Sequence, residues 1–389
     1  MGWYVTRVRK IGILTGGGDA PGLNAVIRAV VLCASNEVQL EVVGIRDGFE
    51  GLLFPERYPE GGLMPLPASR VRDLAGTTGC ILGTAARSDP FRVRSVDEEG
   101  MAREVDRSDE LLKLLSAERI DAVISIVGAR ALGIMWRLGR KGLPVICIPK
   151  SIENDVPSTA LSFGFNSALS FVADSLERAR QAAQSARRVC VAEVPGANAG
   201  WLALQAGIAS GADAILVPEI PYDLSAVADK LRQRAKEGSP YGLVVAAEGA
   251  RAMAAEPALA GVQGSDLKSS LSPGATGGES RQVIESGGRL ASELSLAIQR
   301  LTDEETFPLV LGTLARGGAP TVVDRQLGLG YGAGAVRALS TSRSGSMVVF
   351  QPPDLKLIPL AEAINRYRTL PPDSEFIQIA RALGISLGA

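Results

Sequence analysis

The chain has 389 residues, of which 46% are hydrophobic and 21% charged, and its formal net charge is -1. This length is enough for roughly two domains with well-buried cores. The near-neutral charge gives no electrostatic basis for binding nucleic acid or an anionic membrane, and no apolar run approaches the roughly 20 residues that span a bilayer. The N-terminal residues lack the apolar core of a signal peptide, so we expect a cytoplasmic protein without nucleic-acid or membrane partners.

The sequence contains no histidine, which excludes imidazole bases, histidine metal ligands and histidine-containing triads. Catalysis would then depend on carboxylates, lysine, arginine, hydroxyls and backbone groups. Phosphoryl transfer fits this inventory, because positioning and charge neutralisation carry most of its catalysis. The four cysteines are far apart and mostly lie in apolar stretches, so we expect packing thiols rather than disulfides or a metal cluster.

Apolar runs alternate with amphipathic stretches along the chain, as a doubly wound parallel α/β sheet requires. We expect strands at 11–14, 42–45, 122–127 and 145–148, and a second series at 189–194, 214–217, 242–247 and 309–311. We expect helices at 25–31, 111–116, 131–139, 166–186, 201–210, 224–238 and 283–300. Polar sequence at 92–108 predicts a hairpin or exposed excursion, and the Gly/Ser-rich stretch 261–279 predicts a loop over a site or an exposed insertion.

Three successive glycines follow the first predicted strand, in the segment Gly16-Gly17-Gly18-Asp19-Ala20-Pro21-Gly22, which we call the glycine loop. Glycine tolerates positive φ and lets a ligand approach the backbone closely. The helix behind the loop would point its free N–H groups and the positive end of its dipole at a ligand. The pattern therefore indicates an anion site, and the alternative is an ordinary strand-to-helix turn.

Further charged turns follow other predicted strands, and the strand ends of a doubly wound sheet meet at one crevice. At these turns the chain resembles the phosphofructokinase family. The resemblance extends from about Ile11 to about Ala335 and rests on Gly-Gly-Asp-Ala-Pro-Gly-Leu-Asn at 17–24, Pro-Lys-Ser-Ile-Glu-Asn-Asp at 149–155 and Arg-Gly-Gly-Ala-Pro at 316–320.

This resemblance implies two Rossmann-like α/β domains of the phosphofructokinase fold. A donor-binding domain would span 1–164 plus about 315–350, and a sugar-phosphate domain 165–314 plus about 351–389. It also implies a homo-oligomer, a dimer or tetramer, that transfers phosphate from ATP or pyrophosphate to the 1-hydroxyl of fructose 6-phosphate with Mg²⁺.

The resemblance also assigns roles to individual positions. The expected donor-phosphate contacts are Gly17, Gly18, Arg87 and Lys150, with Arg130 as an added cation. The expected catalytic segment is Ser151, Glu153 and Asp155, with Glu153 as the base. The expected sugar-phosphate residues are Arg188, which would serve a neighbouring subunit, Glu248 and Arg316. The alternative is that Glu153 and Asp155 are capping or loop carboxylates, and that Arg188 and Arg316 form structural ion pairs.

Several positions depart from the family's pattern. Ala129 stands where the family has its magnesium-associated aspartate, and Arg130 follows it, so we expect no metal ligand there, because magnesium needs oxygen ligands. Glu153 replaces an aspartate and is one methylene longer, and misplacing a base by about 1 Å can cost on the order of 10²-fold in rate. A family arginine and histidine are replaced by Phe307 and Thr313, and the Met and Arg of Met-Gly-Arg by Pro195 and Ala197.

These departures predict a 6-phosphofructokinase homologue with strongly impaired or altered activity that still binds an anion without metal. The alternative is a non-catalytic or regulatory subunit of a phosphofructokinase-type oligomer, which binds small phosphorylated metabolites or other anions, in an oligomer of its own or with an intact homologue.

Overall fold

The computed structural model describes residues 8–85, 88–96, 101–253 and 288–389. The chain forms two compact units. The first unit takes its residues from Met1–Ile152, Val156–Ser167 and Arg316–Tyr367. The second unit takes its residues from Glu153–Asp155, Ala168–Ala315 and Arg368–Ala389. Two features expected from the sequence, Arg87 and the Gly/Ser-rich stretch 261–279, lie outside the described residues.

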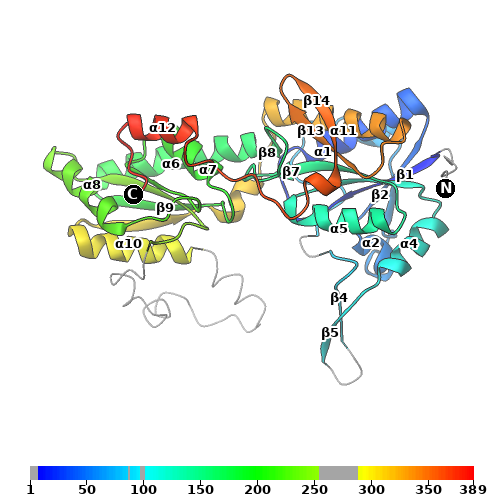
Figure 1. Ribbon diagram of the computed structural model, residues 1–389, viewed down its shortest axis with the longest axis horizontal. Helices are drawn as coiled ribbons and strands as arrows, with labels where there is room; N and C mark the ends of the chain where they lie inside the picture. Colours follow the sequence, from blue (N-terminus) through cyan, green and yellow to red (C-terminus); the bar gives the residue numbers. More distant parts are fainter. Residues whose placement is uncertain (1–7, 86–87, 97–100, 254–287) are drawn as a thin grey trace. The chain divides into compact units, whose positions relative to one another are not determined.

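The described part of the first unit contains an eight-stranded sheet in the order β14-β13-β7-β6-β1-β2-β3, with β8 paired to β7 (Figure 1). Its strands are β1 (Lys10–Thr15), β2 (Glu41–Ile45), β3 (Leu63–Pro65), β6 (Ala122–Val127), β7 (Val145–Ser151), β8 (Phe163–Gly164), β13 (Ser346–Gln351) and β14 (Asp354–Pro359). The central strands run parallel, and β3 and β14 join the edges antiparallel. The strand order changes direction between β1 and β6, where doubly wound sheets open a crevice.

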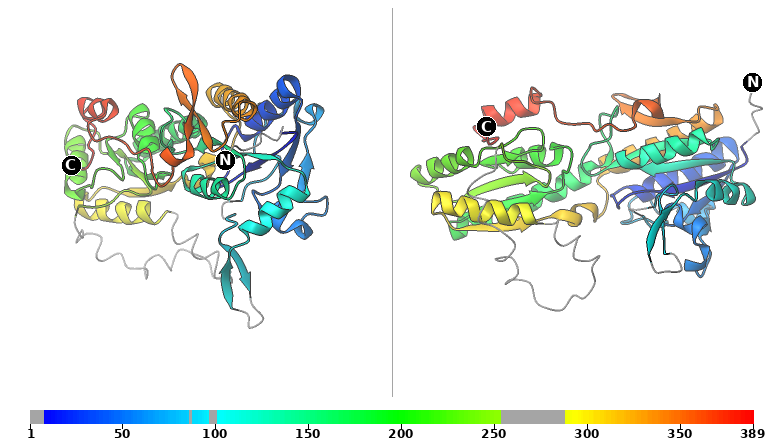
Figure 2. Two further views of the ribbon diagram at one scale, coloured as in Figure 1. Left: turned by 45° about the vertical axis from the view of Figure 1, so that its right-hand side comes forward. Right: turned by 60° about the horizontal axis from the view of Figure 1, so that its bottom comes forward.

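Helices cover both faces of this sheet (Figure 1 and Figure 2). One face carries α1 (Leu23–Cys33), α3 (Ala68–Val71) and α11 (Val322–Ser340). The other carries α2 (Glu50–Leu53), α4 (Ser108–Ala117) and α5 (Ala129–Arg140). Because both faces are covered, β6 is buried at every residue.

Helices α1 and α11 approach each other at glycines. A Cβ placed on Gly332 would lie 2.7 Å from the Cβ of Ala29 and 2.8 Å from the carbonyl oxygen of Val26. One turn earlier, a Cβ on Gly328 would lie 3.3 Å from the carbonyl oxygen of Gly22. The close packing fixes α1, and with it the end of the glycine loop, against α11.

The predicted hairpin is confirmed. Strands β4 (Val93–Val96) and β5 (Ala102–Val105) pair antiparallel and extend away from the sheet of the first unit (Figure 1). A hydrogen bond of 2.8 Å from the amide of Arg107 to the carbonyl of Pro90 closes the base of the hairpin.

The second unit is built on a parallel sheet in the order β10-β11-β9-β12. Its strands are β9 (Val189–Val194), β10 (Ala214–Leu216), β11 (Gly242–Ala247) and β12 (Thr306–Val310). Helices α8 (Leu224–Lys236) and α10 (Arg289–Thr302) pack on one face. On the other lie α6 (Phe165–Ala186), α7 (Trp201–Ala209) and α12 (Glu375–Ala382) (Figure 1). Pro308 lies in β12, at the sheet edge, where its missing N–H breaks no ladder.

The structure confirms the predicted α/β class with doubly wound, mainly parallel sheets. All four cysteines are free, and Cys147 and Cys190 are buried. In the part of the chain that the structure describes, no helix is both long and apolar enough to cross a membrane.

Candidate functional site

The glycine loop leaves β1 at the point where the strand order changes direction. Gly17 has φ +78° and Gly22 has φ +105°, and both values lie in the left-handed region that favours glycine. Gly22 is also the N-cap of α1, which has no side-chain cap. The loop therefore needs glycine at these positions for its backbone path.

Two amides of the glycine loop are already hydrogen-bonded to backbone carbonyls. The amide of Gly16 donates to the carbonyl of Ile126 at 2.9 Å, and the amide of Gly17 donates to the carbonyl of Ala85 at 3.2 Å. The loop thus does not offer all three glycine amides to a ligand. Among the described residues, the amide of Gly18 has no hydrogen-bond acceptor.

Lys150 lies beneath the loop, on β7. The sequence predicts a turn here, but β7 continues through Pro149–Ser151 because Lys150 and Ser151 pair with β8. The side chain is 4% exposed, and Nζ donates to the carbonyl of Gly16 at 2.7 Å and to the carbonyl of Gly18. Burial, reinforced by the nearby Arg316, lowers the pKa of Lys150 to about 7.

Arg316 lies on the other side of the same loop. Its Nη1 donates to the carbonyl of Asp19 at 3.2 Å, and a Cβ placed on Gly18 would lie 3.1 Å from Nη1. The structure thus places Arg316 in the first unit beside the glycine loop, bonded to a backbone carbonyl there. Its sugar-phosphate role stays a prediction.

Helix α5 begins next to the glycine loop with Ala129, the residue that stands in place of the family's magnesium-associated aspartate. Ala129 is 8% exposed, and a Cβ placed on Gly16 would lie 4.0 Å from the Cβ of Ala131 in the same first turn. Arg130 is exposed, and that turn contains no acidic residue. A guanidinium at a helix N-terminus opposes the helix dipole, so the position favours an anion near it.

The residues at this edge do not fit a family-type magnesium site. The nearby acid is Asp19, and its Oδ1 accepts a hydrogen bond from the amide of Ala20. Within the described residues there is no group of three or more Cys, Asp or Glu side chains that could hold a metal ion. Arg316 and Arg130 supply positive charge instead, whereas magnesium requires oxygen ligands.

The predicted base belongs to the second unit. Oε2 of Glu153 accepts a hydrogen bond from the amide of Ala197 at 3.2 Å, in the turn after β9. Asp155 is buried, and its carbonyl accepts from the amide of Arg368 at 2.8 Å. The guanidinium of Arg368 lies 4.1 Å above the ring of Trp201. No sequence motif marks Arg368, whose amide and guanidinium both donate to the backbone of this segment, at Asp155 and Asn154.

Glu248 lies at the same end of the second sheet as Ala197. It is exposed and follows β11, and its amide donates to the carbonyl of Val194 at 3.0 Å. The next residue, Gly249, packs so tightly that an added Cβ would lie 2.2 Å from the carbonyl oxygen of Ala197. Glu153 and Glu248 therefore come to the C-terminal ends of neighbouring strands β9 and β11.

Arg188 lies at the opposite end of β9, next to its first residue. Its Nε donates to Oε2 of Glu305 at 2.9 Å, and the two side chains are 43% and 63% exposed. Phe307 pairs with Cys190 near the same end, and Thr313 is exposed. The second unit thus does not bring Arg188 together with Glu248.

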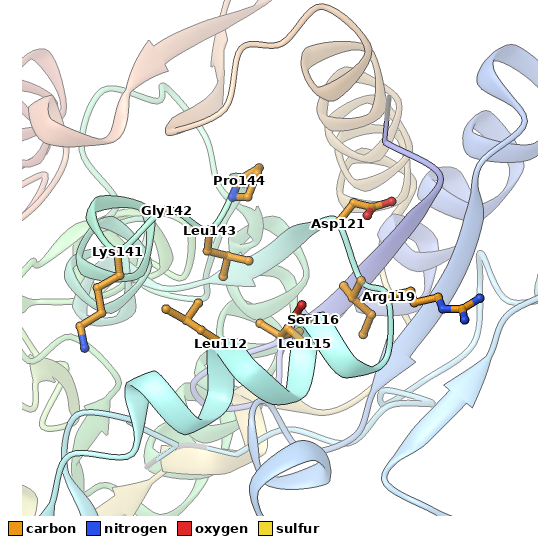
Figure 3. A pocket seen from close by; sticks show the side chains of 10 residues that line it. Leu112, Leu115, Ser116, Arg119, Asp121, Lys141, Gly142, Leu143 and Pro144 are labelled. Atoms are coloured by element: carbon orange, nitrogen blue, oxygen red, sulfur yellow. The ribbon is translucent and has the colours of Figure 1, made fainter. Parts of the chain in front are cut away.

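A hollow of about 320 Å³ lies at the N-terminal ends of β6 and β7, next to α4 and at the opposite end of these strands from the glycine loop (Figure 3). Its floor contains Leu112, Leu115 and Leu143. Figure 3 shows the side chains of Arg119 and Lys141 pointing away from it on opposite sides. Ser116 and Asp121 also line the hollow, but its two cations point outward, and we assign it no ligand.

Comparison with known proteins decides the family. A profile described as phosphofructokinase matches residues 10–339. The chain belongs to the phosphofructokinase family. It is 39% identical to the ATP-dependent 6-phosphofructokinase of Chloroflexus aurantiacus over 98% of this chain and 99% of that protein. It is 34% identical to ATP-dependent 6-phosphofructokinase 2 of Clostridium perfringens over 97% of this chain and 98% of that protein.

Solved phosphofructokinase structures share the fold. The pyrophosphate-dependent phosphofructokinase from Marinobacter aquaeolei matches with a TM-score of 0.74 and 19% identity, over 97% of this chain and 92% of that one. Phosphofructokinase from Pichia pastoris in the T-state matches with a TM-score of 0.72 and 25% identity, over 98% of this chain and 37% of that one. The profile match and the relatives of 34–39% identity confirm the family resemblance seen in the sequence.

Proposed function

We propose that this phosphofructokinase-family protein binds a phosphate-bearing anion at the glycine loop without magnesium, and transfers phosphate to fructose 6-phosphate weakly or not at all. The names of its relatives supply the reaction class, with ATP or pyrophosphate as the donor. One observation carries the proposal. Lys150 and Arg316 hold the loop, and the adjoining first turn of α5 has Arg130 after Ala129 in place of an acid.

Fixed cations and a bound metal ion differ in what they contribute to the reaction. Phosphoryl transfer needs charge stabilisation that strengthens as the transition state forms, and a bound magnesium ion would supply much of it. Cations that contact the ground state and the transition state equally favour binding without raising the rate. The cation-rich edge of the first unit therefore supports binding of the donor more than its reaction.

The acceptor side supports the same proposal. One oxygen of Glu153 is occupied by the amide of Ala197, at a position where the family's arginine is absent. A general base must lie within hydrogen-bond reach of the substrate hydroxyl, and this backbone contact restricts where the longer side chain of Glu153 can place its carboxylate. Glu153 and Glu248 remain the proposed sugar-side residues, and the second unit is the proposed sugar-phosphate part, with the first unit binding the donor.

Arg188 bears on assembly. Because it lies at the far end of β9 from Glu248, it is suited to serve a different site from the one that Glu248 would line. This arrangement supports a homodimer or homotetramer in which Arg188 completes a neighbouring subunit's sugar-phosphate site.

Calorimetry tests the anion site. Phosphate, pyrophosphate and ATP are titrated into the protein in EDTA, and we expect pyrophosphate to bind without metal. Arg130→Ala should weaken that binding by about tenfold, as expected for loss of one charge-assisted contact. Arg119→Ala is the matched control, because Arg119 lies near the N-terminal end of β6, away from the glycine loop, and this variant should bind like wild type. An absence of heat from all three anions would overturn the proposal.

A second candidate is a non-catalytic subunit of a mixed oligomer. Phe307 and Thr313, which replace a cation and a histidine of the family pattern, favour it because the second unit then lacks two expected sugar-phosphate contacts. Co-expression with an intact phosphofructokinase from the same genome tests it. A mixed assembly of fixed stoichiometry, with turnover that depends on this chain, would support it, and separate homo-oligomers would exclude it.

A further inference from the structure

The surroundings of Lys150 are unusual for a charged side chain. Nζ is buried and hydrogen-bonded to two backbone carbonyls of the glycine loop, those of Gly16 and Gly18. No carboxylate within the described residues pairs with it. A buried ammonium is costly unless it is paired and fully hydrogen-bonded, so this arrangement disfavours the charged form.

Counting hydrogen bonds leads to the same conclusion. An ammonium has three N–H donors and no acceptor, whereas a neutral amine has two N–H donors and a lone pair. The carbonyls of Gly16 and Gly18 satisfy two donors. Among the described residues, a third N–H on Lys150 has no acceptor, so the site matches the amine and leaves the ammonium one hydrogen bond short.

Three titratable or charged groups face Lys150 from the elements around it. Arg316, from the turn that precedes α11, disfavours a second positive charge. Asp19 in the glycine loop and Cys80 act in the opposite direction, although both effects are smaller than that of burial. Burial is the largest effect, and together with Arg316 it lowers the pKa of Lys150 to about 7 in the ligand-free protein.

We propose that the glycine loop holds Lys150 as a neutral amine in the ligand-free protein, and that a phosphate group binding at the loop draws a proton from solvent onto Nζ. The phosphate oxygen supplies the missing third acceptor and a compensating negative charge. The amine gains one proton from the buffer and no other bond changes. Lys150 thus holds the loop as a neutral amine and becomes a cation in contact with the phosphate when the anion binds. This inference rests on the anion site of the proposed function.

Calorimetry in buffers of equal pH but different ionisation enthalpy measures the proton uptake. At pH 8 we expect wild type to take up about half to one proton more than Lys150→Arg when pyrophosphate binds, because arginine stays charged. Lys141→Arg is the matched control, since Lys141 is paired with Asp109, and it should behave like wild type. If Lys150→Arg does not fold, sulfate replaces pyrophosphate as the ligand of wild type. Sulfate has no titrating proton near this pH, so any proton taken up on its binding belongs to the protein.

Unfolding of the ligand-free protein separates this inference from the proposed function. A lysine with a lowered pKa binds fewer protons in the folded state than in the unfolded state between pH 7 and about 10, so stability rises with pH there. Wild type should therefore gain stability relative to Lys150→Met between pH 7 and 9. If the stability of wild type rises in this way but no anion binds, the anion site is excluded and the neutral amine is supported. Anion binding with no proton uptake, or equal pH slopes, would overturn the inference.

Discussion

Replacing Gly332 with alanine should separate α11 from α1, the helix that follows the glycine loop. The added Cβ would lie 2.7 Å from the Cβ of Ala29 and 2.8 Å from the carbonyl oxygen of Val26. Carbon contacts are most favourable at about 3.5–4.0 Å, so the helices must move apart by close to 1 Å or accept the overlap. Overpacking of this kind costs about 1–3 kcal/mol, and two contacts below 3 Å place Gly332→Ala in the upper part of that range. After about 1 kcal/mol gained in helix propensity, we expect a net loss of about 1–2 kcal/mol.

The control is the same substitution at a helical glycine with open space around it. No heavy atom lies within 4 Å of a Cβ placed on Gly133 in α5, so Gly133→Ala should stabilise the protein by about 0.5–1 kcal/mol. Thermal unfolding should therefore shift in opposite directions, by about 2–6 °C downward for Gly332→Ala and about 2 °C upward for Gly133→Ala. A Gly332→Ala protein as stable as wild type would refute the packing argument.

Three further predictions concern other parts of the chain. Asp324→Ala should lower the urea-unfolding free energy by about 2–4 kcal/mol, because Oδ2 of this buried carboxylate accepts from the amide and hydroxyl of Ser167, and Asp324→Asn should lose less. Arg188→Ala should change the unfolding midpoint little, because its ion pair with Glu305 is exposed, and a drop of more than about 1 kcal/mol would assign it a structural role. The thiol of Cys147, whose pKa burial raises, should react with a disulfide reagent at pH 8 only after unfolding, and rapid native labelling would contradict its placement.

Much of the fold follows from apolar patterning. The strand predicted at 122–127 coincides with β6, because a strand covered on both faces is a short, uninterrupted apolar run. The sequence analysis gave no prediction for α11. Its glycines lower helix propensity, and only the partner helix shows why they are present: Gly328 and Gly332 let α1 approach.

The candidate site was less predictable, since its chemistry depends on backbone direction. Lys150 is expected as a phosphate-binding cation in a turn, but the structure places it in β7, bonded to carbonyls of the glycine loop. No residue pattern shows which way those carbonyls point. Likewise, Arg316 is expected on the sugar-phosphate side, yet its contact is with Asp19 in the first unit. Side-chain identity indicated the charges, and tertiary structure decided what they contact.

Steady-state turnover is the most direct measure of whether this site transfers phosphate. Fructose 6-phosphate is supplied with Mg²⁺ and either ATP or pyrophosphate, and wild type is compared with the triple variant Ala129→Asp/Arg130→Gly/Glu153→Asp. We expect wild type to turn over well below the roughly 1–100 per second typical of kinases, and the triple variant to be faster. Wild-type turnover within that range with either donor would contradict the claim that this site binds phosphate but transfers it poorly.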